Sequence, residues 1–106
     1  MTLPDSVIAG SSDEFPEGKI VAKRLAGKNI ILIRRQGVVQ CYLDQCAHQP
    51  VKLSEFGEVR EGRLVCHAHG GAFDLDNHGS VLCGPAIEAL MGFRCDEGSG
   101  QVIVFI

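Results

Sequence analysis

Two short motifs, each pairing a thiol with an imidazole, restrict the fold of this chain more than any other feature. The first is Cys46-Ala47-His48 and the second is Cys66-His67-Ala68-His69. The residues between them, 49–65, are enough for a strand hairpin that brings the two loops face to face. Four sulfur and nitrogen donors converging from two loops predict a metal site.

The order of the donors helps to identify the metal. Zinc fingers usually place two Cys in one half of the site and two His in the other, whereas each half here mixes the two residue types. Mixed halves suit a 2Fe-2S cluster in which two cysteines hold one iron and two histidines hold the other. A zinc-stabilised interaction module remains the alternative, and colour and metal content would distinguish the two.

The motifs closely resemble those of the Rieske family. Besides the C-x-H and C-x-x-H motifs, the chain matches that family at Gly70-Gly71, Phe73-Asp74 and Gly84-Pro85. The resemblance extends from about the second strand to the end of the chain. It implies one 2Fe-2S cluster held by Cys46, His48, Cys66 and His69, and a loop containing Pro85 that covers a third side of the cluster.

The ligand charges explain why such a cluster accepts an electron easily. Two thiolates leave the oxidised cluster neutral, so adding an electron costs less than in a cluster with four thiolates. High-potential Rieske proteins also carry a disulfide beside the cluster, together with a serine and a tyrosine that donate hydrogen bonds to its sulfurs. The positions that correspond here lack all of these groups: Val51, Ala68, Gly71 and Phe73. We therefore expect a potential near the lower end of the Rieske range, roughly −150 to +300 mV.

The chain reads as short strands separated by glycine, which predicts an all-β fold. Residues 19–25, 29–34 and 38–43 are β-rich and are joined by gaps of two or three residues containing glycine, so they form an antiparallel meander. Residues 30–33 are apolar at every position, which predicts a strand buried on both faces. A first edge strand at 7–9 and a serine-capped helical turn at 11–15 precede the meander.

The pattern changes after Leu43, where glycine becomes frequent and long apolar runs stop. Three hairpins are predicted, at 58–66, 72–83 and 93–106, and residues 86–91 are expected to be extended. We expect a single Rieske domain over residues 1–106, with an antiparallel β-sandwich base at about 1–43 and 86–106. A small cluster-binding subdomain would be inserted at about 44–85, and the resemblance adds a three-sheet arrangement.

Composition excludes several classes of protein. A net charge of −3 without a basic tract makes nucleic acid an unexpected partner. We expect no membrane span and no signal peptide, since apolar runs are short and the first residues lack the basic and then apolar character of a signal peptide. Three cysteines remain beyond the motifs, and this odd number favours a reducing compartment, the cytoplasm. We expect Cys41 and Cys95 to be buried packing residues, and Cys83 to serve packing near the cluster.

The other polar residues near the motifs are interpreted as surface groups. His67 should point away from the metal and His78 should be solvated in a turn. Six acidic residues lie near the motifs in sequence, and we expect them to form a solvated face; any that instead rim the cluster would steer the protein toward a basic patch on a partner. They are Asp44, Glu55, Glu58, Glu61, Asp74 and Asp76.

The function implied by the resemblance is electron transfer. The chain looks particularly like the ferredoxin components of bacterial multicomponent oxygenases that act on aromatic rings, in aromatic hydrocarbon catabolism. It would be a monomeric, non-enzymatic carrier that takes single electrons from a flavin-containing NAD(P)H reductase and passes them to a terminal oxygenase through transient contacts. The alternative is a small Rieske-like subunit of a larger reductase such as assimilatory nitrite reductase, although many of those have lost ligands and this chain keeps all four.

Overall fold

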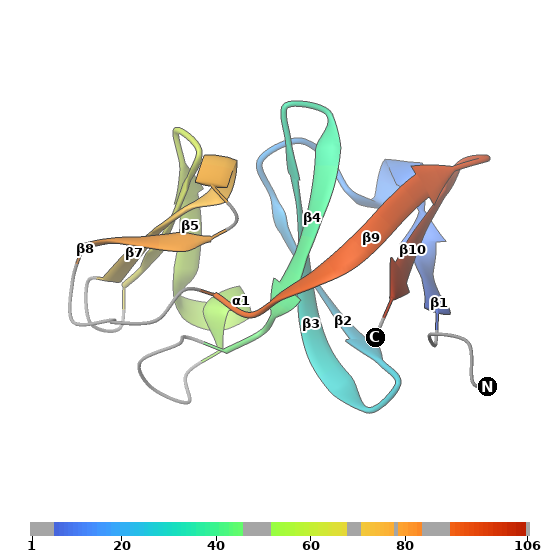
Figure 1. Cartoon of the computed structure of the whole chain (residues 1–106), viewed down its shortest axis with the longest axis horizontal. Helices are drawn as coiled ribbons and strands as arrows, with labels where there is room; N and C mark the ends of the chain where they lie inside the picture. The colour runs from blue at the N-terminus through green and yellow to red at the C-terminus, as the bar shows by residue number, and fades with distance from the viewer. Residues whose placement is uncertain (1–5, 46–51, 68–70, 78, 84–89, 106) are drawn as a thin grey trace.

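The computed structural model describes residues 6–45, 52–67, 71–77, 79–83 and 90–105. These residues form two antiparallel sheets and three short helical turns (Figure 1). The six-stranded sheet has the order β1 (Ser6–Ser11), β10 (Gln101–Phe105), β9 (Gly92–Gly98), β4 (Val38–Leu43), β3 (Lys28–Arg35), β2 (Ile20–Leu25). The four-stranded sheet has the order β5 (Gly57–Arg60), β6 (Arg63–Cys66), β7 (Gly71–Asp74), β8 (Ser80–Cys83). The helical turns are η1 (Ser12–Glu14), α1 (Leu53–Phe56) and η2 (Leu75–Asn77). No helix in this part of the chain has the length and apolar character needed to cross a membrane.

The larger sheet folds over itself because β9 changes partner along its length. Gly92 and Phe93 pair with β4, and the residues from Arg94 onward pair with β10. The β1–β10–β9 half therefore packs against the β2–β3–β4 half, as the predicted sandwich-like base requires. Between the halves lies the base core, formed by Ala9, Phe15, Leu25, Ile30, Leu32, Val39, Cys41, Val102 and Val104.

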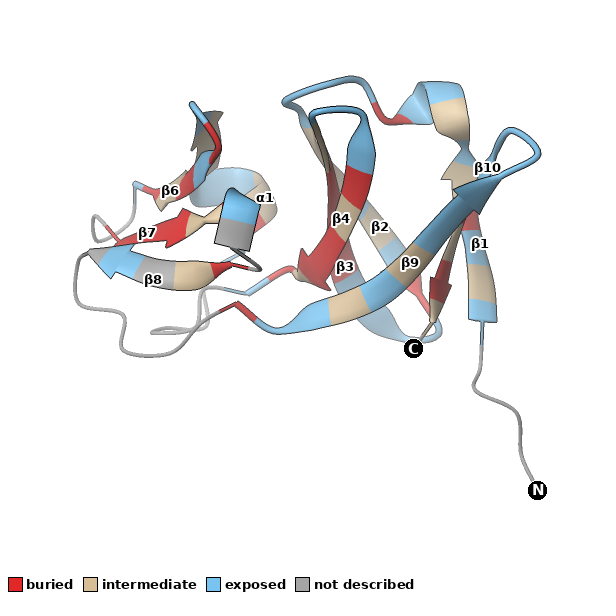
Figure 2. Cartoon of the chain, turned by 45° about the horizontal axis from the view of Figure 1, so that its top comes forward, coloured by how far each residue is buried: buried red, intermediate tan, exposed pale blue. Residues whose placement is uncertain are grey.

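Strand β3 contributes to two cores at once. Ile30 and Leu32 point into the base core, whereas Ile31 and Ile33 belong to a second core between the base and the smaller sheet. All four side chains are 0% exposed, and Figure 2 shows the buried residues gathered on the central strands. Since side chains alternate between the faces of a strand, the continuous apolar run is explained, and the prediction of a strand buried on both faces is confirmed. The second core is completed by Tyr42, Leu53, Leu64, Cys66, Phe73, Leu75 and Leu90.

Most of the predicted connections are confirmed. Four hairpins share a two-residue turn in which both residues have positive φ and glycine occupies the second position, the conformation that suits the twist of antiparallel strands. These turns are Ala26-Gly27, Gln36-Gly37, Glu61-Gly62 and Ser99-Gly100. The connection from β7 to β8 contains the helical turn η2. The predicted extended segment 86–91 lies mostly outside the described residues.

Helix α1 was not predicted from the sequence. Its first residue, Leu53, is fully buried in the second core, and Gly57 donates its backbone N–H to the Leu53 carbonyl. A Cβ atom at Gly57 would lie 2.5 Å from that carbonyl oxygen and 3.1 Å from Leu64 Cδ1. Glycine is therefore needed for the close approach of α1 and β5.

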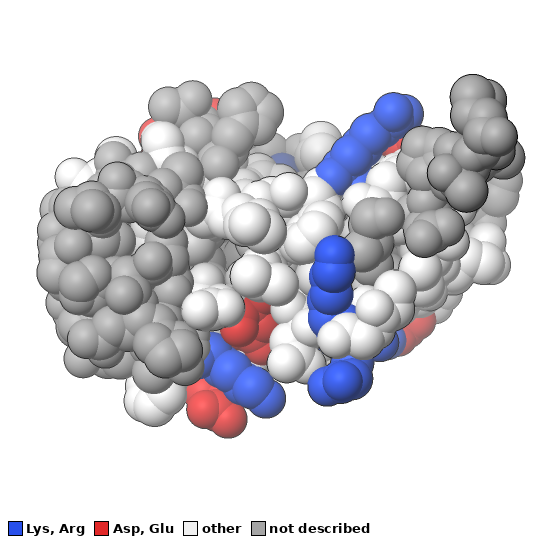
Figure 3. Space-filling view, turned by 60° about the horizontal axis from the view of Figure 1, so that its bottom comes forward, with Lys and Arg blue, Asp and Glu red and all other residues white. Residues whose placement is uncertain are grey.

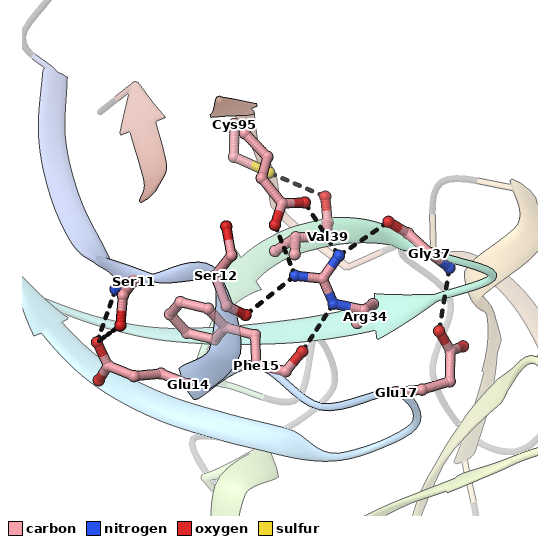
Figure 4. Close-up of polar contacts among 10 residues, drawn as sticks. Ser11, Ser12, Glu14, Phe15, Glu17, Arg34, Gly37, Val39 and Cys95 are labelled. Carbon is pink, nitrogen blue, oxygen red and sulfur yellow. Dashed lines mark hydrogen bonds and ion pairs between the residues drawn. The ribbon is translucent and has the colours of Figure 1, made fainter. Parts of the chain in front are cut away.

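Arg34, near the end of β3, fixes the N-terminal segment to the base (Figure 4). Its guanidinium donates to the carbonyl oxygens of Phe15, Gly37 and Ser12 at 2.7, 2.9 and 3.2 Å. It also donates two bonds, of 3.0 and 2.7 Å, to the carboxylate of Glu97 on β9. The predicted helical turn is present as η1 with Ser11 at its N-cap position, and the Ser11 backbone N–H donates to the Glu14 carboxylate at 2.7 Å.

We predict that Gly57→Ala destabilises the protein. The added methyl group would meet backbone rather than a movable side chain, so either α1 or β5 must shift, and such overpacking typically costs about 1–3 kcal/mol. Urea unfolding of the variant beside Gly98→Ala measures the difference, because a Cβ at Gly98 meets nothing within 4 Å. Equal losses in the two variants would contradict the close approach.

We also predict that the contact between Glu97 and Arg34 stabilises the fold in a pH-dependent way. Hydrogen bonds from Arg34, and then from Ser12, lower the pKa of Glu97 from 4.5 to about 2. A carboxyl whose pKa is lower in the folded state stabilises the fold above its ordinary pKa, and this contribution disappears as pH falls toward the folded value. Glu97→Gln should therefore lower Tm at pH 7, with the difference from wild type shrinking below about pH 5. Asp96→Asn, on the same strand, is the control; a Glu97→Gln deficit that persists unchanged at pH 2–3 would argue against this account.

Candidate metal centre

Of the four predicted ligands, the structure describes Cys66. The other three, Cys46, His48 and His69, lie outside the described residues. The elements that precede both ligand segments, β4 and β6, are described.

Cys66 is the last residue of β6, in the middle of the smaller sheet. It pairs with Gly57 of β5 on one side and Gly71 of β7 on the other, and it is 0% exposed. The pair with Gly71 is the last of the β6–β7 ladder, so Cys66 and Gly71 lie opposite each other at the ends of the two strands that flank the second motif. Strand pairing on both sides fixes the position of Cys66, and a metal cluster requires thiolate donors in fixed positions.

The first ligand segment, residues 46–51, begins beside a buried carboxylate. Asp44 is 7% exposed and follows the end of β4. Its two carboxylate oxygens accept hydrogen bonds from the Ser54 N–H at 2.8 Å and the Ser54 hydroxyl at 2.6 Å. The N–H of Asp44 donates to the Asn29 carbonyl of β3 at 2.8 Å. Residues 44 and 54 are thus joined on either side of the first ligand segment.

Helix α1 also contacts the second ligand segment. The carbonyl oxygen of its last residue, Phe56, accepts a hydrogen bond from the His67 N–H at 2.8 Å. Helix α1 is therefore bonded to His67, which follows Cys66, and to Asp44, which lies two positions before Cys46. Sequence reasoning did not find this link, although the Asp and Ser that form it are both present near the first motif.

The structure confirms the prediction of an exposed His67 side chain. Its Nε2 lies 2.8 Å from Glu58 on β5, and the ring is 54% exposed. Glu58 also pairs with Arg60 at 2.9 Å. Hydrogen bonds from His67, the larger cause, and from Arg60 lower the pKa of Glu58. His78 lies outside the described residues.

The prediction of a solvated acidic face is wrong for Asp44, which is buried and accepts two hydrogen bonds from Ser54 of α1. Asp76 pairs with Arg35 at 3.0 Å, a contact that lowers the pKa of Asp76, and Glu58 is paired as described above. Glu55 and Glu61 are exposed, and Asp74 accepts the Asp76 N–H. On the face shown in Figure 3, the described residues form no continuous acidic area.

The remaining described cysteines serve packing, as predicted. Cys41 is buried in the base core, and this burial raises the pKa of its thiol to about 12. Cys95 packs against the same core, its Sγ lies 3.0 Å from the Val39 carbonyl oxygen, and burial raises its pKa. A thiol kept protonated in this way is a poor nucleophile and a poor metal ligand. The side chain of Cys83 is outside the described residues.

Two positions that matter for a cluster potential are described. Gly71 is buried at the start of β7, and the Phe73 ring is fully buried in the second core, which also contains Cys66. Neither carries a hydroxyl that could donate to a cluster sulfur. Val51 and Ala68 lie outside the described residues.

Comparison with known proteins agrees with the geometry. Residues 5–94 match the family model of the Rieske [2Fe-2S] domain. The ferredoxin component of the naphthalene 1,2-dioxygenase/salicylate 5-hydroxylase systems of Ralstonia sp is 35% identical over 78 residues, which cover 73% of this chain and 72% of that protein. The terminal oxygenase component CarAa of carbazole 1,9a-dioxygenase from Sphingomonas sp is 31% identical over 90% of this chain, which spans only 27% of that protein.

A solved structure has the same fold. The ferredoxin of carbazole 1,9a-dioxygenase from Nocardioides aromaticivorans IC177 superimposes with a TM-score of 0.85 at 20% identity, covering 94% of this chain and 96% of that one. The thiol and imidazole donors of the two motifs, with a buried Cys66 at a strand end, fit the iron–sulfur cofactor of that domain family. The chain belongs to the Rieske [2Fe-2S] domain family, and its cofactor is a Rieske-type 2Fe-2S cluster.

Proposed function

We propose that this chain is a one-electron carrier that takes electrons from a flavin-dependent NAD(P)H reductase and passes them to a terminal oxygenase. The observation that carries the proposal is the similarity, over most of both chains, to a ferredoxin component of an aromatic dioxygenase system. A carrier of this kind needs a redox group and docking surfaces but no catalytic residues of its own. It is the electron-transfer component of such a system, not its catalyst.

The proposed ligands are Cys46 and Cys66 on one iron and His48 and His69 on the other. When bound, the cluster supplies reversible one-electron chemistry. The protein part then has three tasks: to hold four donors in place, to keep Cys66 shielded from water, and to present the histidine side to partners. We assign the cluster-binding part to about residues 44–85 within a single domain of residues 1–106.

The contacts with both partners are proposed to be transient, with the carrier acting as a cytoplasmic monomer. Several charges of the described surface are paired within the chain, as in the contacts of Arg34, Arg35 and Arg60. Small and polar contact areas are typical of redox encounters. The proposed end substrate is an aromatic compound oxidised by the partner oxygenase.

A second candidate follows from the match to the carbazole terminal oxygenase, which covers nearly all of this chain. Rieske domains can supply electrons to a catalytic domain instead of a separate protein. In that case the same ligands would act, but the acceptor would be tied to the domain. The two candidates predict different results when a separate oxygenase is added. It should turn over with this chain if the chain is a free carrier, and not if the chain serves only an attached catalytic domain.

Reconstitution tests the proposed function directly. Candidate reductases and oxygenases are combined with NADH or NADPH and an aromatic substrate, with and without this protein, and product is measured. We expect turnover by one pairing only when the protein is present. Cys66→Ser should abolish turnover together with the Rieske absorption spectrum, because it removes a ligand. Cys95→Ser, a packing cysteine outside the ligand set, should keep both; a colourless, zinc-containing wild type would refute the proposal.

The redox potential gives a separate prediction. Redox titration should place the potential near the lower end of the Rieske window of roughly −150 to +300 mV, since hydroxyl donors are missing at Gly71 and Phe73. Phe73→Tyr should raise it by roughly 40 mV if the new hydroxyl donates to the cluster, the equivalent of about 1 kcal/mol. Phe15→Tyr, a buried ring in the base core, is the control and should leave the potential unchanged. A wild-type value of several hundred positive millivolts would contradict the prediction.

A further inference from the structure

Asp44 is the only buried charged or polar residue among the described residues, and both of its carboxylate oxygens are used to hold Ser54. Burying a carboxylate is unfavourable unless hydrogen bonds compensate. From its position between β4 and the first ligand segment, we propose that Asp44 is a positioning residue for the cluster. Acting through Ser54 and α1, it fixes the first ligand segment relative to the second.

Helix α1 cannot hold this position by itself. It has four residues, far fewer than an isolated helix needs to be stable in water. Its N-terminal N–H groups need acceptors, and Asp44 accepts the one from Ser54. The α1 segment therefore depends on contacts made from outside it, and Asp44 provides the contact at its first turn.

The other contacts of α1 lead to the second ligand segment. Leu53 is buried in the core that also contains Cys66, and the Phe56 carbonyl accepts the His67 N–H. Gly57, immediately after α1, pairs with Cys66 across β5 and β6. A path of direct contacts thus runs from Asp44 through residues 54–57 to Cys66 and to His67, the residue after it.

The bonds to Asp44 close the first ligand segment at its base. Cys46 and His48, two of the proposed ligands, lie between Asp44 and Ser54, which are ten positions apart in the sequence. Without this link the two ends of the span would no longer be bonded to each other, so the donors between them would sample more positions relative to Cys66. Donors that are less well placed hold a metal group less tightly. This inference rests on the cluster-carrying function proposed above, but its test needs neither a reductase nor an oxygenase.

The test measures cluster retention in the loaded protein. Asp44→Ala, Ser54→Ala, the double variant and Ser54→Thr are compared with wild type for the rate of iron release to a chelator, followed by loss of the Rieske absorbance. Asp44→Ala loses two bonds and should release iron roughly tenfold faster, whereas Ser54→Ala keeps the backbone bond and should show about a threefold increase. The double variant should match Asp44→Ala, and Ser54→Thr should restore the wild-type rate.

A matched control separates positioning from general destabilisation. Glu14→Ala removes a carboxylate that accepts a backbone N–H at the start of a helical turn in the base, remote from the ligand segments. It should lower Tm without changing the rate of iron release. The EPR spectrum of the reduced protein should broaden in Asp44→Ala and stay unchanged in Glu14→Ala. Wild-type release rates in both Asp44→Ala and Ser54→Ala, or equal acceleration in Glu14→Ala, would overturn the proposal.

Discussion

The burial of β3 on both faces is the constraint on which the rest of the structure depends. One strand forms a wall of the base core and of the core beneath the smaller sheet. Residues 30–33 are all apolar, however, so the hydrophobic pattern alone does not fix the register: a slip by one residue would leave apolar side chains on both faces. The register must come from elsewhere. The two-residue turns at each end of β3 provide part of it, and the two arginines that follow provide more.

Arg34 and Arg35 continue the alternation of β3 side chains between the two faces, with charged side chains in place of apolar ones. Arg34 bonds to η1 and to Glu97 in the base, and Arg35 pairs with Asp76 beside the smaller sheet. A one-residue slip would exchange the two side chains between faces and lose both ion pairs. Each pair is partly exposed and contributes modestly to stability. Their effect on specificity is larger, because they distinguish the native register from the slipped one that the apolar residues tolerate.

Sequence reasoning succeeded where structure depends on local pattern. The meander, the hairpins with Gly in the second turn position and the doubly buried strand all follow from residues adjacent in the chain. It failed at α1 and Asp44 for a common reason. A four-residue helix shows no apolar periodicity, and only Leu53 of its residues is buried. The partner of Ser54 lies ten residues away across the first ligand motif, so Asp44 resembled a surface acid among other acids. The cofactor could be inferred without geometry, because metal preference is determined by donor chemistry and spacing.

The smaller sheet illustrates why the base and the cluster belong together in this domain. Its four strands have four residues each, and its buried side chains, such as Leu64 and Phe73, pack against the Ile31 and Ile33 face of β3. A sheet of that size has too little core to be stable alone. One side is completed by the base, and the proposed ligand segments follow β4 of the base and β6 of the smaller sheet. Metal ligation would add links between these segments, since binding free energy in such sites contributes to folding. The contacts of α1 with Asp44 and His67 also link these segments, through the protein itself. The site and the fold around it therefore stabilise each other.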